Sequence, residues 1–123
     1  MADLKTENLF YTADRQEWRN WLSAHFETAP DVWFVFPTKA SGEASLSYND
    51  AVEEALCFGW IDSTLKRIDE GKAVQRFSPR RKGSHWSEYN LVRCRRLVKT
   101  GEMTPAGLAA APDLDKSAIG SEI

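Results

Sequence analysis

Residues 60–80 have the sequence WIDSTLKRIDEGKAVQRFSPR, which predicts two extended segments joined by a tight turn. Polar and apolar residues are interspersed along both segments, with Leu65 and Arg67 on the first set against Val74 and Arg76 on the second, as is typical of half-buried strands. The turn falls at DEGK, where Gly71 tolerates the backbone angles that a short loop requires. The pattern therefore predicts a β-hairpin near 61–78.

The sequence before the hairpin predicts two helices and one more strand. The apolar run at 32–37, which follows Pro30, suits a strand that is buried on both faces and central in a sheet. Aromatic and aliphatic residues at helical spacing predict a first helix that begins at Asp14. Ser47 is a candidate N-cap for a second helix, and Gly59 should end that helix.

The sequence after the hairpin predicts a third helix and a short fourth one. The third helix should begin at Ser84 or Ser87 and end at Gly101, and Pro105 suits the first turn of the fourth. Residues 113–123 are expected to fray. We therefore expect one α+β domain over the whole chain, in which a small antiparallel or mixed sheet packs with three main helices and a short C-terminal helix.

The composition is that of a folded protein of one domain. The chain has 123 residues, of which 42% are hydrophobic and 28% charged, and it contains no apolar run long enough for a signal peptide or a membrane span. We therefore expect a cytoplasmic location. Cys57 and Cys94 lie far apart with no neighbouring Cys or His, so we expect two reduced thiols and neither a metal site nor a cofactor.

The charged residues are segregated along the chain. Residues 64–99 contain eleven Lys or Arg and three Asp or Glu, a balance of +8, while the rest contains five cations and fifteen acids, a balance of −10. Two interpretations are open. The basic segment binds phosphate or another anion, or the acidic and basic parts face each other within the fold.

The stretch at 75–90, QRFSPRRKGSHWSEYN, favours the first interpretation. A capped helix start presents free backbone N–H groups with partial positive charge, and the arginines before it can bind carboxylate or phosphate in a two-pronged manner. A solvated basic turn beside a buried Trp86 would contain the same residues. The expected ligand-binding residues are Arg76, Arg80, Arg81, Lys82 and Ser84, with Trp86 lining the site.

Candidate acid and base residues are few. Asp62 can pair with Arg76 or Arg80, or can act as a general base in a cleft, and His85 has a ring that titrates near neutral pH. Glu53 and Glu54 point in different directions on a helix, and the pattern predicts a solvated acidic face for them.

Three blocks, LSYNDAVEEALCFGWIDS, QRFSPRRKGSHWSEYN and GEMTPAGLAA, together resemble the YdeI/OmpD-associated family, whose members are also called bacteriocin-protection proteins. The resemblance runs from about residue 18 to 111. It implies a small α+β domain with a role in protection against bacteriocins or in envelope stress, and it brings no enzymatic activity. The residues matching the family pattern are Cys57, Gly59, Trp60, Asp62, Arg76, Phe77, Pro79, Arg80, Trp86, Ser87 and Asn90, and Asn90 thereby joins the candidate ligand-binding residues.

Three functions are consistent with the sequence. The leading one is a non-enzymatic stress or resistance protein that binds an anionic small molecule or protein partner through a basic groove. The second is an enzyme acting on a phosphorylated or nucleotide-like small molecule, with Asp62 or His85 as acid and base. The third is nucleic-acid binding, and the overall acidity of the chain ranks it last. Its cationic residues would be Arg93, Arg95, Arg96 and Lys99 on the third helix.

Overall fold

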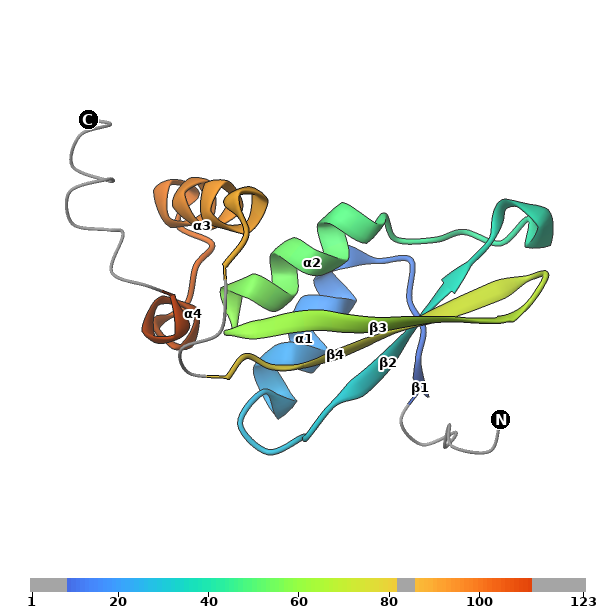
Figure 1. Cartoon of the computed structure of the whole chain (residues 1–123), viewed down its shortest axis with the longest axis horizontal. Coiled ribbons are helices and arrows are strands. Elements are labelled where there is room, and N and C mark those ends of the chain that lie inside the picture. Colours follow the sequence, from blue (N-terminus) through green and yellow to red (C-terminus); the bar gives the residue numbers. More distant parts are fainter. Residues whose placement is uncertain (1–8, 82–85, 112–123) are drawn as a thin grey trace.

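The structure is a computed structural model, and it describes residues 9–81 and 86–111. These residues form a four-stranded mixed sheet and four α-helices, which confirms the predicted α+β class (Figure 1). In chain order the elements are β1 (Leu9–Phe10), α1 (Arg15–His25), β2 (Val32–Pro37), the 3-10 helix η2 (Lys39–Ser41), α2 (Tyr48–Cys57), β3 (Trp60–Asp69), β4 (Lys72–Pro79), α3 (Glu88–Thr100) and α4 (Pro105–Ala110).

The sheet has the order β1-β2-β4-β3. The predicted hairpin is present, because β3 and β4 pair antiparallel, and β4 then pairs antiparallel with β2. The parallel pairing of β1 with β2 makes the sheet mixed. The carboxylate of Asp69 accepts hydrogen bonds from the backbone N–H groups of Gly71 and Lys72, so a side chain closes the hairpin turn.

Strand β2 lies in the interior of the sheet, as predicted, but the expectation that both its faces are buried is wrong. Val32 and Phe34 are buried, whereas Trp33 and Val35, which alternate with them along the strand, are partly exposed. Trp18 of α1 packs against Phe34, with the ring centroids 4.8 Å apart. The helices thus bury one face of β2, and an apolar run of this length does not reveal that its alternate residues face outward.

The core lies between the sheet and helices α1 and α2. Trp18 is fully buried, and its indole N–H donates to the backbone oxygen of Ala51 on α2 at 3.0 Å. Its ring also lies 5.4 Å from that of Phe77 on β4. The largest fully buried side chains are Trp18, Trp60, Phe34, Phe77, Leu22, Leu56 and Leu97. The core therefore connects α1, α2, α3 and the three longer strands.

The helix ends confirm the predicted capping residues. The side chains of Asp14, Ser47 and Ser87 accept hydrogen bonds from backbone N–H groups in the first turns of α1, α2 and α3. Gly101 ends α3 in the left-handed conformation, with φ +85°. Ser84, the other candidate cap of the third helix, lies outside the described residues.

The prediction of a solvated face at Glu53 and Glu54 is wrong. Both residues are buried, and they bind arginines of the two neighbouring helices. Glu54 accepts from Arg15 Nε at 2.5 Å and from Arg19 Nη1 at 2.8 Å, while Glu53 accepts from Arg15 and from Arg96 of α3. Adjacent helical residues point about 100° apart, so the pair can face α1 on one side and α3 on the other.

The hydrogen-bond partners of Glu53 lower its pKa. Burial alone would raise the pKa of Glu53, but hydrogen bonds from Arg96 and Asn49 favour the charged form, and the pKa of Glu53 lies below its ordinary value. The second interpretation of the charge segregation therefore holds for this part of the basic segment. Glu53 of α2 pairs with Arg96, whose side chain is about half exposed.

Candidate anion-binding site

Arg80 joins the end of the hairpin to the region that precedes α3. It directly follows β4, its backbone N–H donates to the oxygen of Gly59 at 2.9 Å, and the residue is only 8% exposed. Its guanidinium carbon lies 3.9 Å from the centroid of the Trp86 ring, which is a close cation–π contact. Burial lowers the pKa of Arg80, although nearby Asp62 favours the charged form.

Asp62 lies between Arg80 and helix α2. It sits on β3 opposite Phe77, and the hydroxyl of Tyr48 donates a hydrogen bond to its carboxylate. Burial raises the pKa of Tyr48, and the bond to Asp62 raises it further because the acceptor stabilises the protonated phenol. Asp62 therefore accepts a hydrogen bond from Tyr48 and is attracted by Arg80. These contacts favour a structural role for this carboxylate over a role as a general base.

The Tyr48–Asp62 bond can be tested by titrating the phenols. In a spectrophotometric titration of the folded protein, one of the three tyrosines should ionise at a higher pH than free tyrosine does. Tyr48→Phe should remove that late step, and Asp62→Asn should move it to lower pH because the charged acceptor is lost. An unchanged titration curve in Asp62→Asn would contradict the bond.

Arg93 on α3 has an unusual set of partners. Its Nε and Nη2 donate to the side-chain oxygen of Asn49 at 3.1 and 2.8 Å, and its Nη1 donates to that of Asn90 at 2.9 Å. Both acceptors are neutral amides, and within residues 9–81 and 86–111 Arg93 forms no ion pair. A guanidinium has five N–H donors, so two remain after these three bonds.

Arg93 differs in this respect from four other arginines. Arg15, Arg19 and Arg96 pair with the carboxylates of α2, and Arg76 pairs with Asp31 at 2.9 Å. Each of those positive charges is neutralised locally. Arg93 is held by three hydrogen bonds, and no carboxylate of the described residues pairs with it. A guanidinium held in this way attracts an anion.

The profile of the family described as "Domain of unknown function (DUF8412)" matches residues 10–110. The chain belongs to this family. No curated protein and no solved structure gave a significant match. The DUF8412 match contains α1 to α4 and every residue of the cluster just described.

In this DUF8412 domain, only some of the predicted site residues come together. Arg80 and Trp86 are in contact, and Asn90 lies one helical turn from Arg93 and orients it. Arg81 is exposed beside Arg80. The predicted residues Lys82, Ser84 and His85 lie outside the described residues.

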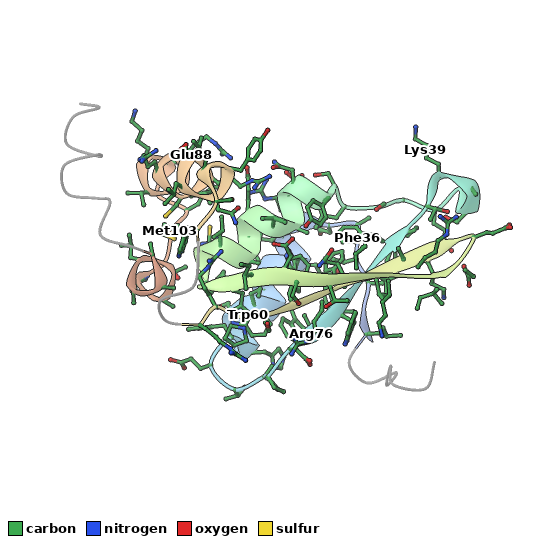
Figure 2. All side chains as sticks on the ribbon, viewed as in Figure 1. Phe36, Lys39, Trp60, Arg76, Glu88 and Met103 are labelled. Carbon is green, nitrogen blue, oxygen red and sulfur yellow. The ribbon has the colours of Figure 1, made fainter. Side chains whose placement is uncertain are left out.

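Arg76 does not belong to the same site. It pairs across the sheet with Trp33, on the face opposite the buried Phe77, and it binds Asp31. Figure 2 shows it well away from Glu88 at the start of α3. The prediction grouped Arg76 with Arg80 because the two are close in sequence, but side chains alternate along a strand.

Tyr48, Asn49 and Arg93 complete the cluster, and the sequence interpretation did not include them in the anion site. Arg93 was assigned only to a cationic helix face. Its contact with Asn49 joins residues 44 positions apart, and no local pattern in the sequence could signal it.

Both cysteines of this DUF8412 domain lie in its interior. Cys57 and Cys94 are buried free thiols, and burial raises the pKa of Cys57 to about 11. In the part of the chain that the structure describes, no three His, Cys, Asp or Glu side chains are arranged to hold a metal ion. None of the described helices has the length and apolar character that a membrane crossing requires.

Proposed function

We propose that the protein binds a small anionic ligand, through a carboxylate or phosphate group, at the cluster of Arg93, Arg80 and Trp86. The observation that carries this proposal is the guanidinium of Arg93. Asn49 and Asn90 fix it, no carboxylate of the described residues neutralises it, and two of its N–H donors are left over. Two N–H groups of one guanidinium can bind both oxygens of a carboxylate or phosphate.

The surroundings of Arg93 favour such a ligand. Its side chain is already ordered, so binding costs little additional rotamer entropy. Arg80 and exposed Arg81 add positive charge nearby, and the carboxylate of Asp62 is bound by Tyr48. The ring of Trp86 holds the Arg80 guanidinium in place and packs partly against the core.

Replacing Arg93 tests the proposal. Phosphate, sulfate and a dicarboxylate such as succinate are titrated into the wild type and into Arg93→Gln, by calorimetry and by thermal shift at low salt. Hydrogen bonds to charged groups are the strong ones, so we expect affinity for the bound anion to fall at least about tenfold in Arg93→Gln. Arg67→Gln, at an exposed hairpin arginine, should bind like the wild type. Equal anion binding by Arg93→Gln and wild type would contradict the site.

We propose nucleic-acid binding as a second candidate function, and a pocket on α3 supports it. The outer face of α3 carries a shallow pocket of about 310 Å³, lined by Val92, Arg95, Arg96 and Lys99. Arg95 and Lys99 of this pocket suit a nucleic-acid backbone. A fluorescent single-stranded oligonucleotide in the same titrations separates the two functions: its binding should depend on Arg95 and Lys99 and weaken steeply with salt, whereas small-anion binding should depend on Arg93.

The biological role that we propose rests on the resemblance of three sequence blocks to the YdeI/OmpD-associated family. We propose a cytoplasmic stress or bacteriocin-resistance protein of the YdeI/OmpD-associated kind that binds its ligand without turnover. The engagement of Asp62 by Tyr48 supports binding over catalysis, because the carboxylate already accepts a hydrogen bond within the protein. Cells lacking the gene should be more sensitive to bacteriocins, and complementation with Arg93→Gln should fail to restore resistance.

A further inference from the structure

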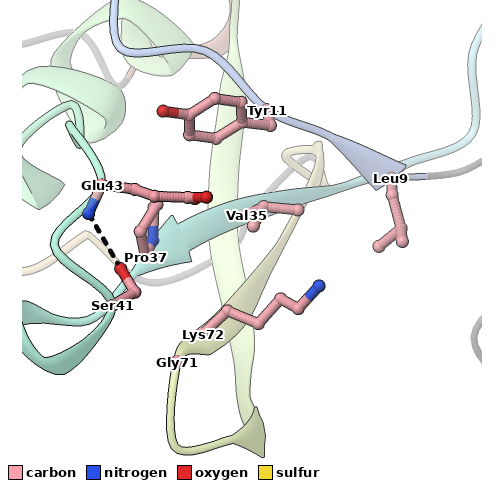
Figure 3. Close-up of a pocket in the computed structure, with 8 residues that line it drawn as sticks. All are labelled: Leu9, Tyr11, Val35, Pro37, Ser41, Glu43, Gly71 and Lys72. Atoms are coloured by element: carbon pink, nitrogen blue, oxygen red, sulfur yellow. Dashed lines mark hydrogen bonds between the residues drawn. The ribbon is translucent and has the colours of Figure 1, made fainter.

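A second pocket lies at the other end of the molecule from α3. It has a volume of about 470 Å³ and is formed by β1 and the residue after it, the end of β2, the loop after η2 and the β3–β4 turn (Figure 3). Figure 1 shows η2 and the hairpin turn at one end of the fold and α3 at the other. This volume is within the range of small-molecule sites, about 300–1,000 Å³.

The floor and one wall of the pocket are apolar. Val35 and Pro37 of β2 lie on the sheet face that the helices leave open, and Leu9 and the ring of Tyr11 stand beside them. Leu9 is 37% exposed and Tyr11 is 46% exposed, although both are large apolar side chains. An apolar ligand group placed here would bury surface that the fold leaves in water.

Hydrogen bonds between separate segments hold the walls in place. The Tyr11 hydroxyl donates to the backbone oxygen of Ala44 at 2.7 Å, which ties the segment after β1 to the loop after η2. The backbone N–H of Thr38 donates to the oxygen of Gly71 at 2.9 Å, which ties the end of β2 to the hairpin turn. The pocket is therefore preformed, and a ligand would not have to order it.

Two side chains of opposite charge line the pocket, each on a different wall. Glu43 comes from the loop after η2 and Lys72 from the start of β4, and Figure 3 shows both side chains extending toward the region of Val35. Neither side chain has an ion-pair or hydrogen-bond partner within residues 9–81 and 86–111. A carboxylate and an ammonium that do not pair with each other can each receive a ligand group of opposite charge.

We propose that this pocket binds a zwitterion with an apolar body and separated charges, the chemistry of an apolar dipeptide. Glu43 would receive the terminal ammonium, Lys72 the terminal carboxylate, and Leu9, Tyr11 and Val35 the side chains. A free amino acid fits less well, because both its charges sit on one carbon while the protein's two charges come from separate walls. The site shares no residue with the Arg93 cluster and does not depend on its function.

The dipeptide leucyl-phenylalanine is the probe for the test. It is titrated into the ¹⁵N-labelled wild type, alongside its N-acetyl form, which lacks the ammonium, and its C-terminal amide, which lacks the carboxylate. Amide signals of residues around the pocket should shift, and each blocked form should bind about tenfold more weakly because one charge-assisted hydrogen bond is lost.

Variants assign each charge to its partner. Glu43→Gln should weaken the dipeptide about tenfold but should not weaken the N-acetyl form further, and Lys72→Gln should behave in the same way toward the amide form. Glu70→Gln and Lys39→Gln, which remove the same charges from exposed neighbours outside the pocket, should bind like the wild type. Arg93→Gln should leave the dipeptide-induced signal shifts around this pocket unchanged, which separates this site from the anion site.

Two results would overturn the proposal. The first is the absence of signal shifts around the pocket at millimolar dipeptide in a protein whose spectrum shows it folded. The second is equal binding of the dipeptide and both blocked forms, since this would leave only an apolar contact without the zwitterion recognition proposed.

Discussion

Glu54→Gln should lower the free energy of unfolding by about 3 kcal/mol, the lower end of the range for breaking a buried ion pair. The Glu54 side chain is 4% exposed and receives Arg15 at 2.5 Å and Arg19 at 2.8 Å. A glutamine keeps the volume and one acceptor, but its NH₂ group would face a guanidinium, and two donors cannot bond to each other. The two arginines are about a third exposed, so water solvates part of the unpaired charge and limits the loss.

Urea unfolding of the two proteins at neutral pH measures this loss, with equal slopes confirming that both unfold in the same way. Glu27→Gln is the matched control, because it removes the same charge from an exposed position just after α1 and should change stability by less than about 0.5 kcal/mol. A loss below about 1 kcal/mol in Glu54→Gln would mean that the cluster is solvated in solution, as the sequence pattern had predicted.

Gly107→Ala should destabilise the protein by about 3 kcal/mol, opposite in sign to the usual effect of this change in a helix. A Cβ at Gly107 would lie 2.4 Å from the backbone oxygen of Cys57 and 2.4 Å from the sulfur of Met103. The thioether can move aside, but the Cys57 oxygen is part of the last turn of α2 and accepts hydrogen bonds from the backbone and hydroxyl of Thr104. Helix α4 would have to shift away from α2.

The control for this change lies two residues along the same helix. Ala109→Gly places a glycine at an exposed position of α4 and should cost no more than about 1 kcal/mol, the ordinary propensity difference. If Gly107→Ala has the wild-type midpoint in urea or a higher one, α4 does not pack this closely on α2. Hydrogen exchange of the α4 amides, which should become faster in Gly107→Ala, locates the effect.

The secondary structure followed from the sequence because its signals are local. The alternation around Val74, the capping side chains of Asp14 and Ser47, and the glycine at the end of α3 each act within a few residues of the structure they specify. The same applies to Pro105, which is found in the first turn of α4. Such features do not require knowledge of which elements pack together.

The candidate site was predicted in part, for the same reason. Arg80, Trp86 and Asn90 lie within one short stretch around a strand end and a helix start, and the charge density of that stretch was visible. Arg76 lies apart from these residues, on the sheet face opposite Phe77, because side chains alternate between the two faces of a strand. Its partner Asp31 is 45 residues away.

The sequence by itself determined the α+β class, the hairpin, the helix caps and the location of the excess positive charge. Only the tertiary structure decided which of those charges are neutralised. Arg96 meets buried Glu53, whereas Arg93, one turn earlier on the same helix, meets only the amides of Asn49 and Asn90. The physical reason is that charge is a property of each residue, while its neutralisation depends on distances between helices that are more than 30 residues apart in the chain.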